Sequence, residues 1–401
     1  MPDDGASLLT GPDVAPLLEA AVRHAGGELL HWQLDHVDQA PEQSTTATYL
    51  ATVQWPHGRR TELLGVSARS GELQPTDANA EIFADGNRRV AVWVYPNDPD
   101  LSGLARAAFP DRMAEVLTGG GLVPAPLTGD QLSLAMIGYR PRRRAVVKVQ
   151  VGPLVFYVKV LRERHFQGVY QRHLLLRDAG IPAPEVALVT DDHLLVTREL
   201  PGEPLARALF APGDPCTPEA LIELLDSMPA AVNGLERRPP WADAAAHYGR
   251  LVVAPMPEVR SDVEWLVDKI ERGLAGYPPG NEATHGDFHE GQVHVAGGRV
   301  VGILDVDTIG PGRRADDLAC LIGHLSTIQR MNPVQEAKVR DLLARWVPVF
   351  DRRVDPVELR LRAAAVILSL ATGPYRGQEP DWREQTLSMV RAAMALVQQV
   401  V

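Results

Sequence analysis

The alternation of apolar and polar residues over the first 120 positions predicts a small module of mixed helix and strand. Apolar residues fall on one face of a helix over 11–25, which Gly26-Gly27 ends. Residues 46–55 and 60–68 flank the turn Pro56-His57-Gly58 and are typical of a hairpin, and residues 90–95 form a further strand. Short helices follow to about residue 117, and Thr118-Gly119-Gly120-Gly121 marks a boundary.

Closely spaced apolar runs then predict a β-rich segment. Its strands are expected over 132–139, 145–151 and 154–161, with a helix over 164–179 and two short strands at 185–189 and 193–196. After about residue 205 the pattern is helical, except for a short hairpin within 291–306 around Gly297-Gly298. We therefore divide the chain into an N-terminal module (1–120), a β-rich lobe (121–204) and a mainly helical lobe (205–401).

Composition adds limits on the kind of protein. The 401 residues carry a formal charge of −11, which disfavours a general nucleic-acid binder. The acidic start and the lack of a long apolar run indicate neither export nor a membrane span, so we expect a cytoplasmic protein. Cys216 and Cys320 are too few for a disulfide framework and are expected in the core.

The candidate chemistry lies where the hairpin interrupts the helical lobe. His285-Gly286-Asp287-Phe288-His289-Glu290-Gly291-Gln292 precedes the hairpin, and Asp305 follows it. Two carboxylates can thus converge at one end of the hairpin. Phosphoryl transfer assisted by Mg²⁺ needs one carboxylate beside the attacking hydroxyl and further oxygen ligands for the metal.

These residues resemble the aminoglycoside phosphotransferase and choline kinase-like superfamily over roughly 130–330. The shared features are the H-G-D loop, a ligand residue five positions after Asp287, the apolar strand that ends at Asp305, and the helix start Asp317-Leu318-Ala319. The resemblance implies an α+β, bilobal protein-kinase-like fold. Residues 1–120 are additional, and their layout is similar to the cap of maltokinase and glucosamine-kinase-like enzymes.

The resemblance also implies site roles. Asp287 would orient or deprotonate the acceptor hydroxyl, and Gln292 and Asp305 would hold Mg²⁺. The supporting residues would be His285, Asp317, Asp307 and His289, with His285 bracing the loop and Asp317 holding its backbone.

Nucleotide contacts are expected in the β-rich lobe. By the same resemblance, Lys159, one of four lysines in the chain, corresponds to the lysine that binds the nucleotide phosphates in the superfamily. Its other interpretation is a solvent-facing charge on an edge strand. Arg198, Glu199 and Leu200 lie in the expected hinge, whose backbone would contact a purine. No side chain there distinguishes ATP from GTP.

Three features depart from the family pattern. The helix after Lys159 has only Glu163 at its start as an acidic partner, with Gln167 or Gln171 as substitutes. The first β turn, 138–144, has one glycine and four arginines, which either contact phosphate or form an exposed basic turn. Gln292 replaces the commoner Asn.

The acceptor is expected to be a small hydroxyl compound, namely an aminoglycoside, an amino sugar or a sugar. Glu379, Asp381 and Glu384 precede the last helix and either bind ammonium groups of an amino sugar or form a solvated surface. No residue identifies the acceptor or the oligomeric state.

Other interpretations remain open beside this one. The spacing of His285, His289 and His294 resembles a zinc motif, but a loop followed by a strand does not suit such a site. The alternative function is a catalytically idle nucleotide-binding or regulatory module.

Overall fold

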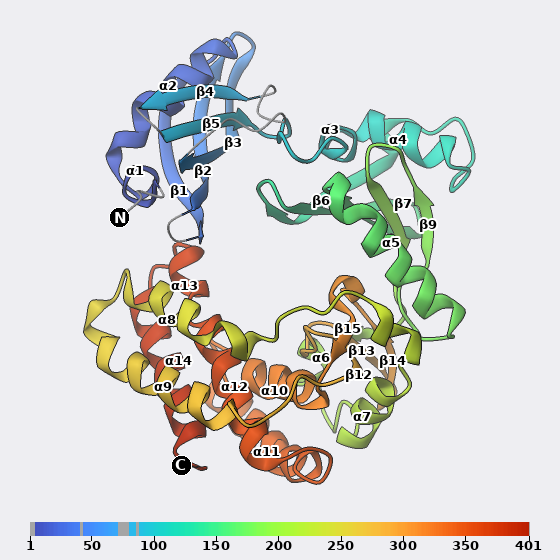
Figure 1. Ribbon diagram of the computed structural model, residues 1–401. Helices are drawn as coiled ribbons and strands as arrows, with labels where there is room; N and C mark the ends of the chain where they lie inside the picture. The colour runs from blue at the N-terminus through green and yellow to red at the C-terminus, as the bar shows by residue number, and fades with distance from the viewer. Residues whose placement is uncertain (1–4, 41–42, 71–79, 86–87, 401) are drawn as a thin grey trace. The chain divides into compact units, whose positions relative to one another are not determined.

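The structure is a computed structural model of the chain and describes residues 5–40, 43–70, 80–85 and 88–400 (Figure 1). The chain divides into two compact units, each of which is described by itself. The first comprises Met1–Gln167, Val186–Glu199 and Arg376–Gln378, and the second comprises Gly168–Glu185, Leu200–Tyr375 and Glu379–Val401.

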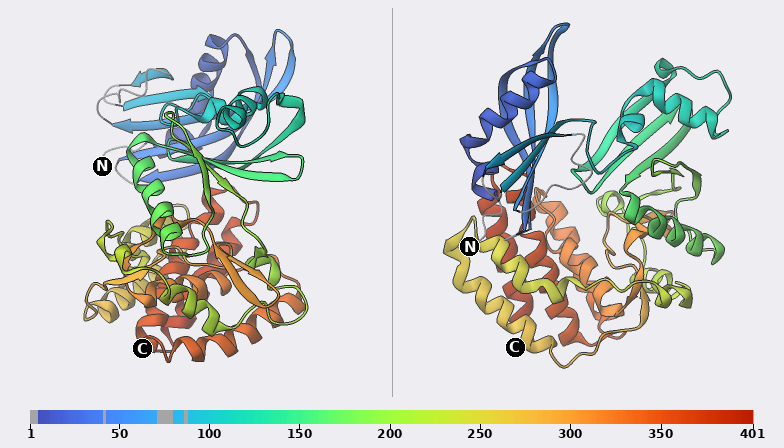
Figure 2. Two further views of the ribbon diagram at one scale, coloured as in Figure 1. Left: turned by 90° about the vertical axis from the view of Figure 1, so that its right-hand side faces the viewer. Right: turned by 45° about the horizontal axis from the view of Figure 1, so that its top comes forward.

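The first unit begins with an antiparallel five-stranded sheet of order β1-β2-β3-β5-β4. Its strands are β1 (Glu28–Ala40), β2 (Ser44–Trp55), β3 (Gly58–Ser70), β4 (Glu81–Asp85) and β5 (Arg88–Val94). Helices α1 (Ala6–Thr10) and α2 (Ala15–His24) pack on this sheet (Figure 2). Leu18 and Tyr49 are fully buried in the core that the helices and the sheet share. The predicted helix and hairpin are confirmed.

Two strands of this sheet, β1 and β4, are missing from the sequence-based prediction. The register of β1 against β2 shifts between Leu29 and His31 and again between Leu34 and His36. Each shift moves the apolar positions to the other face of the strand, because side chains alternate with a period of two. The alternation of apolar and polar residues over 28–40 is therefore broken twice, so the sequence pattern does not indicate one long strand.

A second antiparallel sheet of the first unit has the order β6-β7-β8-β10-β9. Its strands are β6 (Leu132–Arg140), β7 (Arg144–Val151), β8 (Leu154–Leu161), β9 (Val186–Val189) and β10 (Leu194–Arg198). Helices α3 (Leu104–Ala108) and α4 (Pro110–Gly119) share a core with one face. Buried Val158 and Val160 point toward that core, which leaves Lys159 on the opposite face. The predicted meander is confirmed.

The second unit is mainly helical (Figure 1). Its helices are α5 (Glu163–Asp178), α6 (Leu205–Ala208), α7 (Pro218–Asp226), α8 (Ala245–Val253), α9 (Arg260–Leu274), α10 (Arg314–Leu325), α11 (Pro333–Phe350), α12 (Pro356–Leu370), α13 (Gly373–Arg376) and α14 (Trp382–Val397). Helix α12 is central and packs against α9, α10 and α14. None of the helices in the described part of the chain is long and apolar enough to cross a membrane.

Helix starts follow the sequence signals only in part. The Thr217 hydroxyl accepts from the Ala220 amide at the start of α7, and the Asp355 carboxylate accepts from the Glu358 amide at the start of α12. The sequence Ser261-Asp262-Val263-Glu264 has the Ser-x-x-Glu pattern of a capping box and predicts a helix start there, but this prediction is wrong. Helix α9 already includes Arg260, because the short 3₁₀ turn Pro257–Val259 leads directly into it.

Short strands frame the loop that carries the candidate chemistry. Strand β12 (Glu282–Thr284) pairs with β15 (Gly310–Gly312) before the loop, and β13 (Val293–Ala296) follows it. Strand β13 pairs with β14 (Arg299–Ile303) and with β11 (Glu203–Pro204). The expected hairpin is thus present, and the predicted α+β class is confirmed.

Candidate active site

The loop 285–292 is anchored to helix α10 through one buried carboxylate. Asp317 is fully buried, and its two oxygens accept from the amides of His285 (2.9 Å) and Gly286 (2.8 Å). The Arg314 guanidinium, one helical turn earlier, also donates to it at 3.2 Å. Burial raises the pKa of Asp317, and these donors oppose the rise by stabilising the charged form. The start of the loop is therefore fixed by hydrogen bonds to a single residue.

His285 fixes the loop to the end of strand β14. Its Nε2 donates to the Leu304 carbonyl oxygen (2.9 Å), and its Nδ1 accepts from the amide of Asp287 (3.3 Å). One donor and one acceptor are what a neutral imidazole offers. The Thr308 hydroxyl donates to the His285 carbonyl oxygen at 2.7 Å. These contacts place His285 between the loop and the residue after strand β14, and its bracing role stays a prediction.

Asp287 is half-buried and follows Gly286, whose φ of +82° lets the chain turn. Cys320 of α10 lies on its inner side, with Sγ 3.9 Å from Oδ1 of Asp287. Burial and the adjacent carboxylates raise the pKa of Cys320 well above its usual value, so the thiol stays protonated and can donate weakly. The carboxylate of Asp287 thus has one side against the protein.

His289 stacks on His324 of helix α10, with ring centroids 4.1 Å apart and planes inclined by 6°. Burial lowers the pKa of both rings, that of His324 to about 3. Both imidazoles are therefore neutral at physiological pH. The carboxylates of Asp287 and Asp305 oppose this shift at His289, so His289 lies within the field of both.

Gln292 is held by His289. Its carboxamide lies 3.0 Å from Nε2 of His289, whose Nδ1 accepts from the Gly291 amide at 3.1 Å. A neutral ring that accepts at Nδ1 carries its proton on Nε2 and donates there. We therefore assign the carboxamide oxygen of Gln292 to the atom that faces His289, since amide orientation follows from the hydrogen-bond network. That oxygen keeps a second lone pair for a cation.

Asp305 lies two residues after strand β14, and its backbone is in the left-handed region, with φ of +48°. Such a conformation is uncommon outside glycine and is often found at functional sites. The amide of the preceding Leu304 donates to the Gln292 carbonyl oxygen at 2.7 Å, so Gln292 and Asp305 lie at adjacent strand ends. Asp307 follows in the short 3₁₀ turn Val306–Thr308 and is half-buried.

Two different sets of donors lie around this loop, and they differ in their fit to a metal. Atoms of Asp287, His289 and His324 all lie within 4.8 Å of one another. A metal ion lies in the plane of each imidazole that binds it, so two stacked rings cannot share one ion without rotating apart. The oxygens of Gln292 and Asp305 are instead hard donors of the kind that Mg²⁺ prefers. The donor chemistry therefore fits Mg²⁺ better than a zinc site.

The histidine that completes the zinc-like spacing has a structural partner. His294 is buried, and its Nδ1 lies 3.0 Å from the Pro201 carbonyl oxygen. This contact agrees with the interpretation of His294 as a satisfied structural side chain.

The predicted nucleotide residues of the first unit lie on or next to strands β8 and β10. Lys159 of β8 opposes Val146 of β7 and Leu195 of β10. The Arg198 guanidinium lies 5.8 Å from the centre of the Phe156 ring, and the Glu199 carboxylate pairs with Lys148 at 3.9 Å. Strand β8 has a neighbour on each side, so Lys159 lies in the middle of the sheet and the edge-strand interpretation is wrong.

The remaining hinge residue, Leu200, belongs to the second unit. Its side chain is mostly buried and lies against Gly302 of β14, where an added methyl group would come within 2.7 Å of it. The expected hinge residues thus divide between the two units, with Arg198 and Glu199 in the first and Leu200 in the second.

The basic turn between β6 and β7 contacts its own unit. The Arg142 amide donates to Oδ2 of Asp98 at 2.7 Å, and the same oxygen accepts from the Tyr139 hydroxyl at 2.7 Å. The Arg142 guanidinium lies 5.2 Å from the centre of the Trp93 ring. Arg142 is therefore buried against the N-terminal sheet, and it is not the exposed basic side chain that one interpretation of this turn expected.

Sequence reasoning missed Glu290, Cys320 and His324. Burial raises the pKa of Glu290 to about 7, and its Oε2 has no hydrogen-bond partner among the described residues. Cys320 and His324 follow Asp317 by three and seven positions, which places all three on one face of α10. Because Asp317 anchors the loop, this spacing is the sequence signal that could have identified Cys320 and His324 as neighbours of the loop.

Comparison with known proteins gives a family match and several similar folds. The model of the phosphotransferase enzyme family matches residues 137–354, and no curated protein matches the chain. Choline kinase LicA from Streptococcus pneumoniae has 12% identity and a TM-score of 0.48, over 71% of this chain and 99% of that one. A choline/ethanolamine kinase family protein from Mesorhizobium loti has 20% identity and a TM-score of 0.47, over 71% and 94%.

A third similar structure is a thermostable mutant of the aminoglycoside phosphotransferase APH(4)-Ia. It has 16% identity and a TM-score of 0.46, and the match covers 67% of this chain and 94% of that one. The family match spans the loop 285–292, Asp305 and Asp317. The resemblance inferred from these motifs is thereby confirmed.

Proposed function

The chain belongs to the phosphotransferase enzyme family, and from this premise we propose that it transfers the γ-phosphate of ATP to a hydroxyl group of a small polar molecule. The observation that carries the proposal is the fixed position of Asp287. Its loop is held by Asp317 at one end and by the bond between Gln292 and Leu304 at the other. Positioning is what this reaction requires, because its loose transition state asks little of a strong base.

Asp287 would orient the acceptor hydroxyl and accept its proton as the bond to phosphorus forms. One side of the carboxylate faces Cys320, which leaves the other side for the acceptor. Gln292 and Asp305 would hold Mg²⁺, which supplies neutralisation of the phosphate charge when bound. His289 would hold the Gln292 carboxamide in the orientation that leaves its oxygen available to the metal. Asp307 would support the site from the 3₁₀ turn Val306–Thr308 that follows Asp305.

The nucleotide roles follow the family resemblance. Lys159 would contact the phosphates, and the backbone at Arg198, Glu199 and Leu200 would contact the purine edge. The position of Lys159 on the face of its sheet opposite the apolar core supports this role. ATP is the expected nucleotide, and GTP offers the same phosphates.

The acceptor would belong to the aminoglycosides, amino sugars or sugars. Of the acidic residues considered for binding ammonium groups, Glu379 and Asp381 pair with Arg330, which favours a surface role for them. A cytoplasmic location stays a prediction from the sequence.

Turnover by full-length protein tests the proposal. Release of ADP from Mg-ATP is measured with panels of aminoglycosides, amino sugars and sugars, and Asp287→Asn is compared with Asp243→Asn, an exposed carboxylate elsewhere in the second unit. We expect Asp287→Asn to lower kcat by about a hundredfold or more, since misplacing a reacting group by about 1 Å can cost about 10²-fold. Asp243→Asn should leave kcat unchanged. Unchanged turnover in Asp287→Asn would contradict the role of Asp287.

The same measurements separate the enzyme from an idle module. Thermal stabilisation by Mg-ATP, with no release of ADP from ATP in the presence of any of the acceptors, would favour a nucleotide-binding regulator. The idle module is kept as the alternative because Arg142 is buried. The turn that carries it, which in the family covers the nucleotide phosphates, packs against the N-terminal sheet instead.

A further inference from the structure

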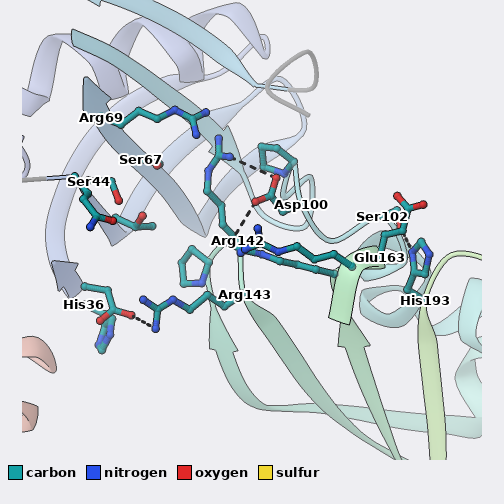
Figure 3. A pocket seen from close by; sticks show the side chains of 17 residues that line it. His36, Ser44, Ser67, Arg69, Asp100, Ser102, Arg142, Arg143, Glu163 and His193 are labelled. Carbon is teal, nitrogen blue, oxygen red and sulfur yellow. Dashed lines mark hydrogen bonds and ion pairs between the residues drawn. The ribbon is translucent and has the colours of Figure 1, made fainter. Parts of the chain in front are cut away.

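The first unit contains a cavity of about 660 Å³ that does not include the residues discussed so far as the active site. Its walls come from strands β1 to β3, from residues 99–102, from the turn between β6 and β7 and from the start of α5 (Figure 3). The volume lies within the range of small-molecule pockets, about 300–1,000 Å³. A ligand of the size of a phosphorylated sugar therefore fits.

The charge of this cavity is opposite to that of the protein. Five arginines line it: Arg69, Arg142, Arg143, Arg162 and Arg164. Three acidic residues line it as well: Asp38, Asp100 and Glu163. The local balance is thus five positive against three negative charges, whereas the whole chain carries −11. An anion is the complementary ligand.

Two of these arginines are only loosely paired with the carboxylates. Arg162 lies 3.4 Å from Asp100, and Arg143 lies 3.5 Å from Asp38. Charge-assisted hydrogen bonds are shorter, about 2.7–2.9 Å. Nε of Arg162 is buried without a hydrogen-bond partner among the described residues, and so is Nε2 of His36. Donor capacity at these side chains therefore exceeds what the protein's own acceptors use.

The charges around Arg162 also favour a bound anion. Burial lowers the pKa of Arg162, the neighbouring Arg164 and Arg143 lower it further, and Asp100 opposes them. Like charges held together in a partly buried cavity repel each other, and a bound anion would relieve that repulsion.

The lining also includes hydroxyl groups. Ser44, Thr46 and Ser67 of the N-terminal sheet line the cavity, and Ser102 adds a further hydroxyl near His193 (Figure 3). Hydroxyl side chains donate and accept hydrogen bonds, as the hydroxyls of a polyol require. The cavity thus combines guanidinium groups with a polar neutral surface.

We propose that this cavity binds the phosphate group of a small polyhydroxy compound, with Arg143, Arg162 and Arg164 contacting the phosphate and the serine and threonine hydroxyls contacting the polyol. Guanidinium groups bind phosphate oxygens in a bidentate geometry, which favours arginine over lysine at such a site. The proposal concerns binding alone. It does not rest on the proposed function, because neither Asp287 nor Lys159 lines the cavity.

Isothermal titration of the full-length protein, without nucleotide, tests this site. The probes are glucose 6-phosphate, inorganic phosphate and glucose. The test variant is Arg143→Gln with Arg164→Gln, and the matched control is Arg23→Gln with Arg60→Gln, two exposed arginines of the same unit outside the cavity. Asp287→Asn is included to show that binding is independent of catalysis.

We expect glucose 6-phosphate to bind, and we expect the test variant to bind it about tenfold or more weakly, since it loses two arginines that form charge-assisted hydrogen bonds to the phosphate. The control and Asp287→Asn should be unchanged, and glucose should not bind. Tighter binding of the ester than of inorganic phosphate identifies the phosphorylated polyol as the ligand, whereas equal binding overturns the polyol contacts. Equal affinity in the test variant and the control, or no binding of either phosphate compound, overturns the site itself. Thermal unfolding of each variant shows whether it remains folded.

Discussion

The Asp317 carboxylate accepts the His285 amide at 2.9 Å, across 32 positions of the sequence, in a fully buried site. In Asp317→Asn one oxygen becomes an NH₂ group, which would face a backbone N–H donor. Arg314 would also lose its buried counter-charge. We expect about 3 kcal/mol of lost stability, the size seen when one partner of a buried pair is removed. Urea unfolding measures it.

The same substitution should lower kcat, because the loop that carries Asp287 loses its anchor. Asp317 acts through the loop backbone, so the KM for ATP should change little. Asp243→Asn is the control for both measurements, since Asp243 is exposed. Wild-type stability and kcat in Asp317→Asn would contradict the anchoring role.

Gly286 offers a test of the loop's backbone. Its φ is +82°, and a methyl group there would lie 2.8 Å from the Thr308 carbonyl oxygen. Gly297 also has a positive φ, +56°, but nothing lies within 4 Å of the added carbon. Gly297→Ala should cost about 1–2 kcal/mol from the left-handed conformation alone. Gly286→Ala should lose more stability in urea unfolding than Gly297→Ala does, and it should also lower kcat. Equal losses of stability in the two variants would contradict the predicted clash with the Thr308 carbonyl oxygen.

The sequence predicted the meander and the hairpin after the H-G-D loop because their apolar positions alternate with little interruption. It did not reveal strand β1, because two register shifts break the alternation there. The capping box at Ser261 failed for a different reason. A local motif was present, but the 3₁₀ turn before it already set the start of the helix.

The sequence-based prediction of the site relied mainly on residues that lie close together along the chain. Asp287 and Gln292 belong to one short motif, and Asp305 follows the second strand of the hairpin after it. Cys320 and His324 contact the loop only because α10 folds back against it, through Asp317. Such contacts depend on tertiary packing, so the H-G-D motif alone does not predict them. The spacing of Cys320 and His324 from Asp317 along α10 is the only sequence signal for them.

His289 is expected to act through Gln292. In His289→Phe the ring still stacks on His324, but the hydrogen bonds to Gln292 and to the Gly291 amide are lost. The Gln292 carboxamide is then free to rotate, so its oxygen is less available to Mg²⁺. We expect the Mg²⁺ concentration for half-maximal turnover to rise several-fold. A lower kcat with unchanged Mg²⁺ dependence would contradict this account.

His324 should make the protein sensitive to acid. Burial lowers its pKa from 6.5 to about 3, so the unfolded chain takes up a proton below pH 6.5 while the folded protein does not. Stability is therefore fully present above pH 6.5 and is lost as the pH falls toward 3. At about pH 5 the loss is roughly 2 kcal/mol at most, from about 1.4 kcal/mol per pH unit.

His324→Phe removes this titration and keeps an aromatic ring against His289. Urea unfolding at about pH 7.5 and about pH 5 should therefore show a smaller loss of stability on acidification in His324→Phe than in the wild type. His57→Phe is the matched control, because His57 is exposed at the turn between β2 and β3. An identical pH dependence in His324→Phe and the wild type would show that His324 does not resist protonation in the folded protein. The comparison is independent of catalysis, since it needs neither nucleotide nor acceptor.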